Sequence, residues 1–367
     1  MMFSERKEKL KFIHTGDIHL GAKFSSSSIG SEKGKIRREE IWGTFKRMVD
    51  FAVEENISLI LISGDLYEES YFTHRDMRRL NEIISTAKDV QFVIIAGNHD
   101  RMSPDSIFFN WNWSDNVTLF EEGKIQKKLL DDLGVVVHGA SWTKASNALD
   151  MASALERERD YFNILMLHGD VMGNSKYMSL AIHELRNLSM DYVALGHIHK
   201  PMFLEKNIAY CGSLEGLDFG ETGERGFILG ILDDTPEFEF IPFSRRIFMT
   251  SEILVDGNSS QSEVFLQALE AIDRSSRQYY HRIILKGTRS LYLELETLKS
   301  ELEEVCYHIE VLDETIPDID IEQLAVVHND NIIGSFIKSF DDKIDDKLNQ
   351  RALYLGILAL LEGGEDL

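Results

Sequence analysis

The sequence is poor in cysteine and in long apolar runs. Its two cysteines, Cys211 and Cys306, lie far apart and outside any CxxC pair, which excludes a zinc knuckle or a disulfide framework and is consistent with a reducing compartment. The first residues, MMFSERKEKLKF, lack the apolar core of a signal peptide. No apolar stretch reaches the roughly 20 residues that span a bilayer. We therefore expect a cytoplasmic protein with no membrane partner.

Basic residues are also outnumbered, with 39 Lys and Arg against 62 Asp and Glu and a net charge of −23. Taken alone, this charge argues against generic binding to nucleic acid. Surplus acid keeps a protein soluble, and an acidic metal site would add to it. The 367 residues, 43% hydrophobic and 28% charged, are typical of a globular protein of two or three domains.

The stretch Gln91–Asp100, QFVIIAGNHD, is the most informative part of the sequence. A continuous apolar run reaches a glycine and then presents Asn98, His99 and Asp100. Apolar runs of this length between turn residues are typical of fully buried parallel strands. In open α/β sheets, ligands bind at the carboxyl ends of such strands.

The same pattern recurs four more times: KFIHTGD from residue 11, LILISGD from residue 59, FNILMLHG from residue 162 and YVALGHIH from residue 192. Most of these endings contain a glycine, which permits a sharp turn and a close approach to a ligand. A lone histidine after a strand is usually a hydrogen-bonded loop residue. Five strands that deliver Asp, Asn or His at the same end predict one shared site.

Seven side chains at these strand ends are good metal ligands: Asp17, His19, Asp65, Asn98, His168, His197 and His199. Histidine nitrogens combined with carboxylate oxygens suit Mn²⁺, Fe²⁺ or Zn²⁺. Seven ligands fit two ions better than one, and two ions about 3.5–4 Å apart can clamp the oxygens of a phosphoryl displacement. Asp65 is the candidate for the shared carboxylate. His99 is the candidate for the general acid that protonates the leaving oxygen.

Strands and helices alternate up to about residue 245, which predicts a layered α/β domain over residues 1–245. Residues 246–316 predict a small β-α-β-α-β domain. Residues 317–367 contain two segments with apolar residues at helical spacing, Asn331–Phe340 and Asp345–Leu361. In the second segment these residues are Leu348, Ala352, Leu355, Leu358 and Leu361.

The motifs DxH, GD, GNHD, HG and GHxH, in this order over residues 15–199, resemble the calcineurin-type metallophosphoesterase superfamily. The fuller patterns TGDIHLG, ALGHIHKP and AYCGSLEGLDFGETGERGF are similar to its DNA-repair exonuclease branch, the SbcD/YhaO-like nuclease subunits. The similarity extends to about residue 245. It implies an α/β fold with a four-layer β-sandwich flanked by helices, a capping domain and two manganese ions.

This resemblance also implies a role for each site residue. One ion would be held by Asp17, His19, Asp65 and His199, and the other by Asp65, Asn98, His168 and His197. His99 would be the catalytic histidine. Family members often have Asp or His three residues after the GD aspartate, where this chain has Glu68. Glu68 and Asp100 are candidates for the hydrogen-bonded surroundings of the ligands.

The resemblance further implies partners. The small second domain resembles a capping domain that contacts duplex DNA, and the tail occupies the place where such nucleases dock on an SbcC-like, coiled-coil ABC-type ATPase. A homodimer is also implied. No Walker A motif, GxxxxGK[ST], occurs in the sequence, so any ATP dependence would come from the ATPase. Candidate contacts to DNA phosphates are Lys33, Lys35, Arg37, Arg38, Arg245 and Arg246.

The leading hypothesis is a Mn²⁺-dependent DNA nuclease, an exonuclease with or without endonuclease activity, that hydrolyses phosphodiesters with metal-activated water during DNA repair. One alternative is a small-molecule phosphodiesterase or protein phosphatase on the same scaffold. The 122 residues after Arg245 argue against it, because a small substrate needs no second domain. Another alternative is a non-catalytic scaffold that recruits an ATPase, and the complete ligand set argues against this.

Overall fold

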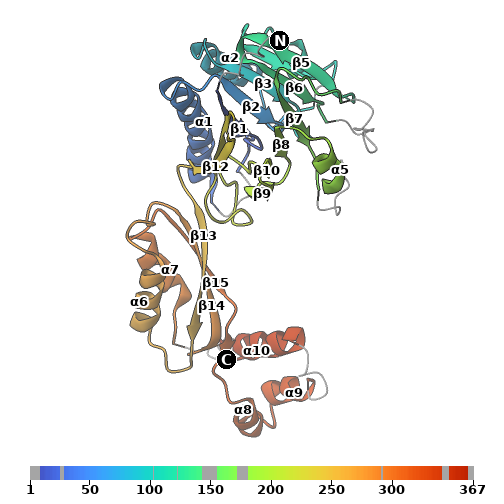
Figure 1. Cartoon of the computed structure of the whole chain (residues 1–367). Helices are drawn as coiled ribbons and strands as arrows, with labels where there is room; N and C mark the ends of the chain where they lie inside the picture. Colours follow the sequence, from blue (N-terminus) through green and yellow to red (C-terminus); the bar gives the residue numbers. More distant parts are fainter. Residues whose placement is uncertain are drawn as a thin grey trace. The chain divides into compact units, whose positions relative to one another are not determined.

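The computed structural model describes residues 9–24, 29–101, 103–121, 123–142, 155–171, 181–290, 292–340 and 347–362. The chain divides into two units, Met1–Ile247 and Phe248–Leu367, and both are drawn in Figure 1.

The first unit contains two six-stranded sheets. The first sheet has the order β12-β11-β1-β2-β3-β4, in which β1 to β4 are parallel and β11 and β12 add an antiparallel edge. Its strands are β1 (Leu10–Thr15), β2 (Leu59–Ser63), β3 (Gln91–Ile95), β4 (Val117–Leu119), β11 (Gly226–Leu232) and β12 (Glu237–Pro242).

The second sheet has the order β5-β6-β7-β8-β10-β9. Its four central strands are parallel, whereas β5 and β9 pair antiparallel at the two edges. The strands are β5 (Gln126–Leu130), β6 (Val135–Gly139), β7 (Phe162–His168), β8 (Tyr192–Gly196), β9 (Met202–Glu205) and β10 (Ile208–Tyr210).

The two sheets pack face to face around one buried cluster. Phe12 and Leu61 of the first sheet belong to this cluster together with Ile164 and Met166 of the second. Every residue of β2, β7 and β8 is buried, because each of these strands is covered on both faces. This arrangement explains why these strands have continuous apolar sequences rather than alternating ones.

Helices cover the outer faces of the two sheets. Figure 1 shows α1 (Ser31–Glu54) and α2 (His74–Thr86) on one side of the pair and α5 (Ile182–Asn187) on the other. On the α5 side, Leu185 packs against Leu165 and Leu195 of the second sheet. The layers are therefore helix, sheet, sheet and helix, and the α/β sandwich expected from the sequence is confirmed. Two short helical turns, α3 (Ile107–Asn110) and η1 (Asp131–Leu133), lie in connections.

The second unit begins with a parallel sheet of β13 (Phe248–Val255), β14 (Tyr280–Arg289) and β15 (His308–Asp313), to which β16 (Ile316–Pro317) adds a short pairing. Helices α6 (Gln261–Ala271) and α7 (Leu295–Glu303) connect these strands and lie on the same face of the sheet (Figure 1). One buried cluster joins the two helices to this face.

Three helices complete the second unit: α8 (Ile321–Val327), α9 (Ile332–Lys338) and α10 (Lys347–Glu362). In α10 the apolar residues noted at helical spacing do not mark the buried face, because Leu353 and Ile357 are fully buried whereas Leu355 is 58% exposed. Packing against α9 sets this register, since a Cβ atom at Gly356 would collide with the ring of Phe336. Within the described residues, no helix has the length and apolar character needed to cross a membrane.

Candidate metal centre

The five strand ends identified in the sequence converge at one end of the sandwich. Donor atoms of Asp17, His19 and His199 lie within 4.8 Å of one another, and those of Asp17, Asp65 and His168 form a second such group. The residues come from both sheets, from the end of β7 and from just after β1, β2 and β8. Parallel strands direct their carboxyl ends to the same edge of each sheet, and the two sheets pack with these edges together, so residues distant in sequence meet here.

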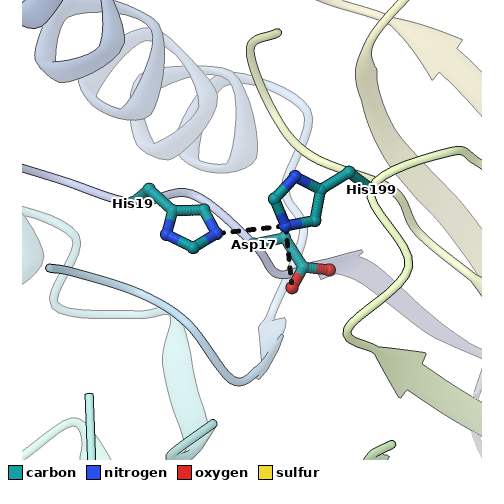
Figure 2. Close-up of side chains that lie close together, drawn as sticks. All are labelled: Asp17, His19 and His199. Carbon is teal, nitrogen blue, oxygen red and sulfur yellow. Dashed lines mark hydrogen bonds and ion pairs between the residues drawn. The ribbon is translucent and has the colours of Figure 1, made fainter. Parts of the chain in front are cut away.

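In the first group, two imidazole rings approach each other beside a carboxylate (Figure 2). Nε2 of His19 lies 3.2 Å from Nε2 of His199, which in turn lies 3.9 Å from Oδ1 of Asp17. Nε2 of His19 is also 3.9 Å from Oδ2 of Asp65. These four residues are the set that the family resemblance implied for one ion.

In the second group, Nε2 of His168 lies 3.4 Å from Oδ2 of Asp65 and 3.0 Å from Oδ1 of Asn98. The same Asn98 oxygen lies 3.2 Å from Nδ1 of His197. Oδ2 of Asp65 thus approaches histidines of both groups, as a bridging carboxylate must. Asp17 also belongs to both groups of donor atoms.

Backbone strain is concentrated at this site. Six non-glycine residues in the described part of the chain have positive φ, and four are candidate ligands: Asp17 (47°), His19 (50°), Asp65 (50°) and His197 (101°). This region of φ is unfavourable for residues with a side chain, and strain of this kind clusters at functional sites. The surrounding fold holds these residues in conformations that direct donor atoms inward.

Glycines allow the strand ends to come this close. A Cβ atom at Gly97 would collide with the carboxylate of Asp65, and one at Gly196 would collide with the carbonyl oxygen of Ser63. The glycines of the GNHD and GHIH motifs are therefore needed for packing of the backbone around the donors, in addition to any role in turning the chain.

Hydrogen bonds fix the orientation of the histidine rings. Nδ1 of His19 donates to Oε1 of Glu68 at 2.8 Å, and Nδ1 of His199 donates to Oε1 of Glu221 at 2.6 Å. Nδ1 of His168 donates to the carbonyl oxygen of Ser63 at 2.9 Å. A neutral imidazole has one N–H, so each Nε2 is left with a lone pair directed at the other donors.

This arrangement is the fit that a metal centre requires. When both rings are neutral and carry their proton on Nδ1, Nε2 of His19 and Nε2 of His199 face each other at 3.2 Å as two lone pairs. A cation among the donors relieves that repulsion. Metal-bound histidines characteristically donate the second ring N–H to a carboxylate or a carbonyl, as these rings do.

The electrostatics favour a cation as well. Burial lowers the pKa of His168, but the carboxylate of Asp65 outweighs burial and raises that pKa to about 9. Burial likewise opposes the effect of Glu221 and Asp17, which raise the pKa of His199 to about 9. Carboxylates that increase the proton affinity of neighbouring imidazoles create a negative potential, and divalent ions would satisfy it in place of protons.

His99 lies beside these donors and is more accessible than they are. Its Nδ1 lies 2.9 Å from Oε1 of Glu68, the atom that also accepts the proton of His19, and its side chain is 43% exposed. The hydrogen bond with Glu68 raises the pKa of His99, which favours the protonated ring. His19, Glu68 and His99 are close enough to form a third group of donor atoms.

Asp100 is fully buried and supports the site through the backbone. Its carboxylate accepts hydrogen bonds from the N–H groups of Asp65 at 3.1 Å, Leu66 at 2.6 Å and Gly97 at 2.6 Å. These contacts join the loop after β2 to the loop after β3. Asp100 therefore fixes the position of Asp65 rather than presenting its own oxygens to the ligands.

Among the predicted DNA contacts, the prediction for Arg37 requires correction. The guanidinium of Arg37 is fully buried, lies 2.7 Å from Oε2 of Glu215, and donates to the carbonyl oxygen of Gly216 at 2.6 Å. A buried guanidinium in an ion pair does not reach a DNA phosphate. Its position in a helix gave no sign of this, because the partner lies 178 residues away in the sequence.

The other basic residues predicted to contact DNA differ in their exposure and in their ion-pair partners. Lys35 is exposed and pairs with Glu32, whereas Arg38 is about one-third exposed and pairs with Asp76. Lys33 is half-buried near the start of α1.

At the end of the first unit, Arg245 is 58% exposed and Arg246 is 14% exposed. Both approach the carboxylate of Glu40. The contacts of these residues with DNA stay predictions.

Glu221 is the site residue that the sequence analysis missed. It stands in GETGERG, where nothing in the local spacing distinguishes it from Glu224. Its position after the GHIH motif, within the longer family-like pattern, was the available signal.

Comparisons with known proteins agree with this geometry. The sequence profile of the calcineurin-like phosphoesterase family matches residues 10–201, which is more than half of the chain. The two-sheet sandwich with clustered aspartates and histidines at its strand ends agrees with the fold and site of a metal-dependent phosphoesterase. The chain is a member of the calcineurin-like phosphoesterase family and thus a metal-dependent hydrolase. Members of this family bind two divalent metal ions.

Curated relatives extend beyond this domain. The chain is 27% identical over 320 residues to the uncharacterized metallophosphoesterase YhaO of Bacillus subtilis, covering 80% of this chain and 76% of the relative. It is 24% identical over 368 residues to the DNA double-strand break repair protein Mre11 of Saccharolobus solfataricus, covering 93% of each chain. The Mre11 protein of Archaeoglobus fulgidus is 25% identical over 357 residues, covering 81% of this chain and 76% of the relative.

Proposed function

We propose that this protein is a DNA nuclease that hydrolyses phosphodiester bonds with two divalent metal ions. Mn²⁺ is the best candidate for both ions. The single observation that carries the proposal is the convergence of seven candidate metal ligands from both sheets beside the accessible His99. DNA as the substrate is supported by the two relatives named as double-strand break repair proteins. One of these alignments covers 93% of the chain, and so includes the second unit.

Each predicted ligand has a place in this proposal. Asp17, His19, Asp65 and His199 would hold one ion, and Asp65, Asn98, His168 and His197 the other. When bound, such a pair of ions stabilises charge on the attacking and leaving oxygens of an in-line displacement. The mixture of imidazole and carboxylate donors suits Mn²⁺, and Fe²⁺ or Zn²⁺ would also fit.

His99 would complete the chemistry as a general acid. Because Nδ1 is engaged by Glu68, Nε2 is the ring atom that can deliver a proton to the leaving oxygen. The raised pKa keeps this proton on the ring at higher pH than for an ordinary histidine. A leaving alkoxide needs such a proton, since the 3′ or 5′ oxygen of DNA is a poor leaving group without one.

The remaining regions would serve binding. We assign residues 246–316 to a capping domain that contacts duplex DNA, with Lys33, Lys35, Arg38, Arg245 and Arg246 as phosphate contacts. Residues 317–367 would dock on a coiled-coil ABC-type ATPase. The exposed side chains of Val326, Ile332 and Leu355 support a docking role for this segment. A homodimer would be the working unit.

A digestion assay tests the nuclease proposal. The full chain is incubated with Mn²⁺ and blunt-ended duplex, hairpin or single-stranded DNA, and in parallel with a small phosphodiester. We expect DNA cleavage that His99→Ala slows and that His183→Ala, a change at an exposed histidine of α5, leaves unchanged. Hydrolysis of the small phosphodiester without cleavage of any DNA would favour the small-molecule phosphodiesterase instead. The products also distinguish exonuclease from endonuclease action.

A further inference from the structure

The loop that follows β10 contacts the candidate metal ligand His199 at the ring nitrogen that points away from the other donors. Oε1 of Glu221 accepts the Nδ1 proton of His199 at 2.6 Å, and the Glu221 side chain is only 15% exposed. Nε2 of the same ring lies among the other donors, 3.2 Å from Nε2 of His19. In a neutral or metal-bound His199 ring, the carboxylate of Glu221 thus keeps the proton on Nδ1 and leaves the lone pair on Nε2.

The second oxygen of Glu221 is fixed as well. Oε2 accepts hydrogen bonds from Oγ of Ser213 at 3.1 Å and from the N–H of Leu217 at 3.2 Å. The N–H of Ser213 donates in turn to the carbonyl oxygen of His199 at 2.9 Å. The loop therefore contacts both the ring and the backbone of this ligand, and the carboxylate has little freedom to turn away.

The middle of this loop is anchored to α1. Glu215 is buried, and its Oε1 accepts hydrogen bonds from Oγ1 of Thr44 at 2.5 Å and from the N–H of Arg245 at 2.6 Å. Its Oε2 lies 2.7 Å from the buried guanidinium of Arg37. These contacts tie the loop to a long helix and to the segment that leaves the first unit.

We propose that Glu221 is a positioning residue of the metal centre, which holds the ring of His199 in the tautomer and orientation that present Nε2 to a bound ion. The Glu221 side chain is held in place by the anchored loop 213–221. The proposal rests on the metal-dependent reaction of the family and does not require DNA as the substrate. Carboxylates that orient a ligating histidine typically change metal affinity about 10- to 100-fold when they are removed.

Calorimetric titration of Mn²⁺ into the metal-free full chain tests this role. We expect Glu221→Gln, which keeps the shape but loses the charge, to weaken one of two binding events about tenfold. Glu221→Ala should weaken the same event by up to about 100-fold. The matched control is Glu224→Gln, which removes the same charge from an exposed position three residues away and should leave both events unchanged.

A spectroscopic measurement separates positioning from a general loss of structure. In the wild type loaded with diamagnetic Zn²⁺, ¹⁵N shifts of His199 should report a protonated Nδ1 and a metal-bound Nε2, whereas Glu221→Ala should give a mixture of ring states. Thermal melting without metal identifies a variant that has lost its fold, and Glu221→Gln then carries the test.

Two Mn²⁺ bound as tightly in Glu221→Ala as in wild type would overturn the proposal. An equal loss in Glu224→Gln would also overturn it. Absence of DNA cleavage combined with the expected change in affinity would reject the nuclease and leave the role of Glu221 intact.

Discussion

The strand ends of the first unit and the sheet of the second unit use similar charged side chains in opposite ways. On the sheet, each Lys or Arg side chain forms an ion pair with a carboxylate of a neighbouring strand: Arg282 with Glu310 at 2.7 Å, Lys286 with Glu252 at 2.5 Å and Arg289 with Asp313 at 2.9 Å. At the strand ends, lone pairs of histidines and carboxylates face one another. Charges that are balanced within the chain need no ligand, whereas facing lone pairs call for a cation from outside.

The largest effect should come from the carboxylate shared by the two groups of donors. We expect Asp65→Asn to reduce Mn²⁺-dependent phosphodiester hydrolysis roughly 10⁴-fold, because metal ions contribute several kcal/mol and each 1.36 kcal/mol is a factor of ten. Asparagine retains the shape and tolerates the positive φ of this position. Asp89→Asn, at an exposed turn, should have no effect. If Asp65→Asn kept activity within tenfold of wild type, the donors at the strand ends would not depend on a bound cation, and they would not differ in this respect from the charges on the sheet.

Replacing His99 should separate proton transfer from metal binding. His99→Ala should lower kcat on DNA about 10²- to 10³-fold, since general acids typically contribute this much. The same variant should hydrolyse a diester with a p-nitrophenolate leaving group nearly as fast as wild type, because that group needs no proton. Both bound ions should be retained, as measured by elemental analysis. Equal losses on the two substrates would argue against a general acid.

The ion pair of Arg37 and Glu215 differs from both regions, because its charges are balanced within the chain and are also buried away from water. Removing one partner leaves an uncompensated buried charge on Glu215, so Arg37→Met should lower the free energy of unfolding by about 3–5 kcal/mol. The neighbouring Arg38→Met, at a partly exposed side chain, should change it by less than about 1 kcal/mol. Urea denaturation measures the free energy of unfolding of both variants. If Arg37→Met lost as little stability as Arg38→Met, the buried ion pair would not stabilise the fold.

Glu68 offers a test based on pH. A raised pKa means that His99 stays protonated as pH rises past its ordinary value, and that the acid is lost only as pH passes the folded-state pKa. Glu68→Gln removes the main cause of the shift, so the alkaline limb of kcat against pH should move to lower pH. His74→Gln, at an exposed histidine, serves as the control. An unchanged limb would show that Glu68 does not set the protonation of His99.

The smallest effect should come from the exposed ion pair on the sheet, Lys286 with Glu252. Lys286→Ala should leave the free energy of unfolding unchanged within the error of urea denaturation, because exposed ion pairs contribute little in water. It should leave metal binding unchanged. A loss of several kcal/mol would show that these pairs contribute more than balanced surface charges do.

The sequence was most informative where local pattern and long-range structure coincide. Ligand candidates such as Asp65 and His168 lie at or within two residues of the end of a buried apolar strand, so the pattern that predicts the strand also predicts the side chain's place at the sheet edge. The layered fold followed from the same strands. The close approach of His19 to His199 also needed the two sheets to pack with the carboxyl ends of their parallel strands together, because β1 and β8 belong to different sheets.

Residues whose role depends on a distant partner could not be predicted in this way. Arg37 looks like any exposed base on a helix until Glu215 is brought against it. Glu221 lies in an irregular loop with no periodicity to indicate its partner. For α10, the buried face was set by contact with α9 near Gly356, and the apolar spacing alone did not mark that face.

A crystal structure of the protein grown with Mn²⁺, examined by anomalous scattering from manganese, tests the central claim most directly. Our account predicts two peaks about 3.5–4 Å apart, with the carboxylate of Asp65 bound to both and His168 and His199 on opposite ions. A single peak, or two peaks that share no ligand from the strand ends, would contradict it.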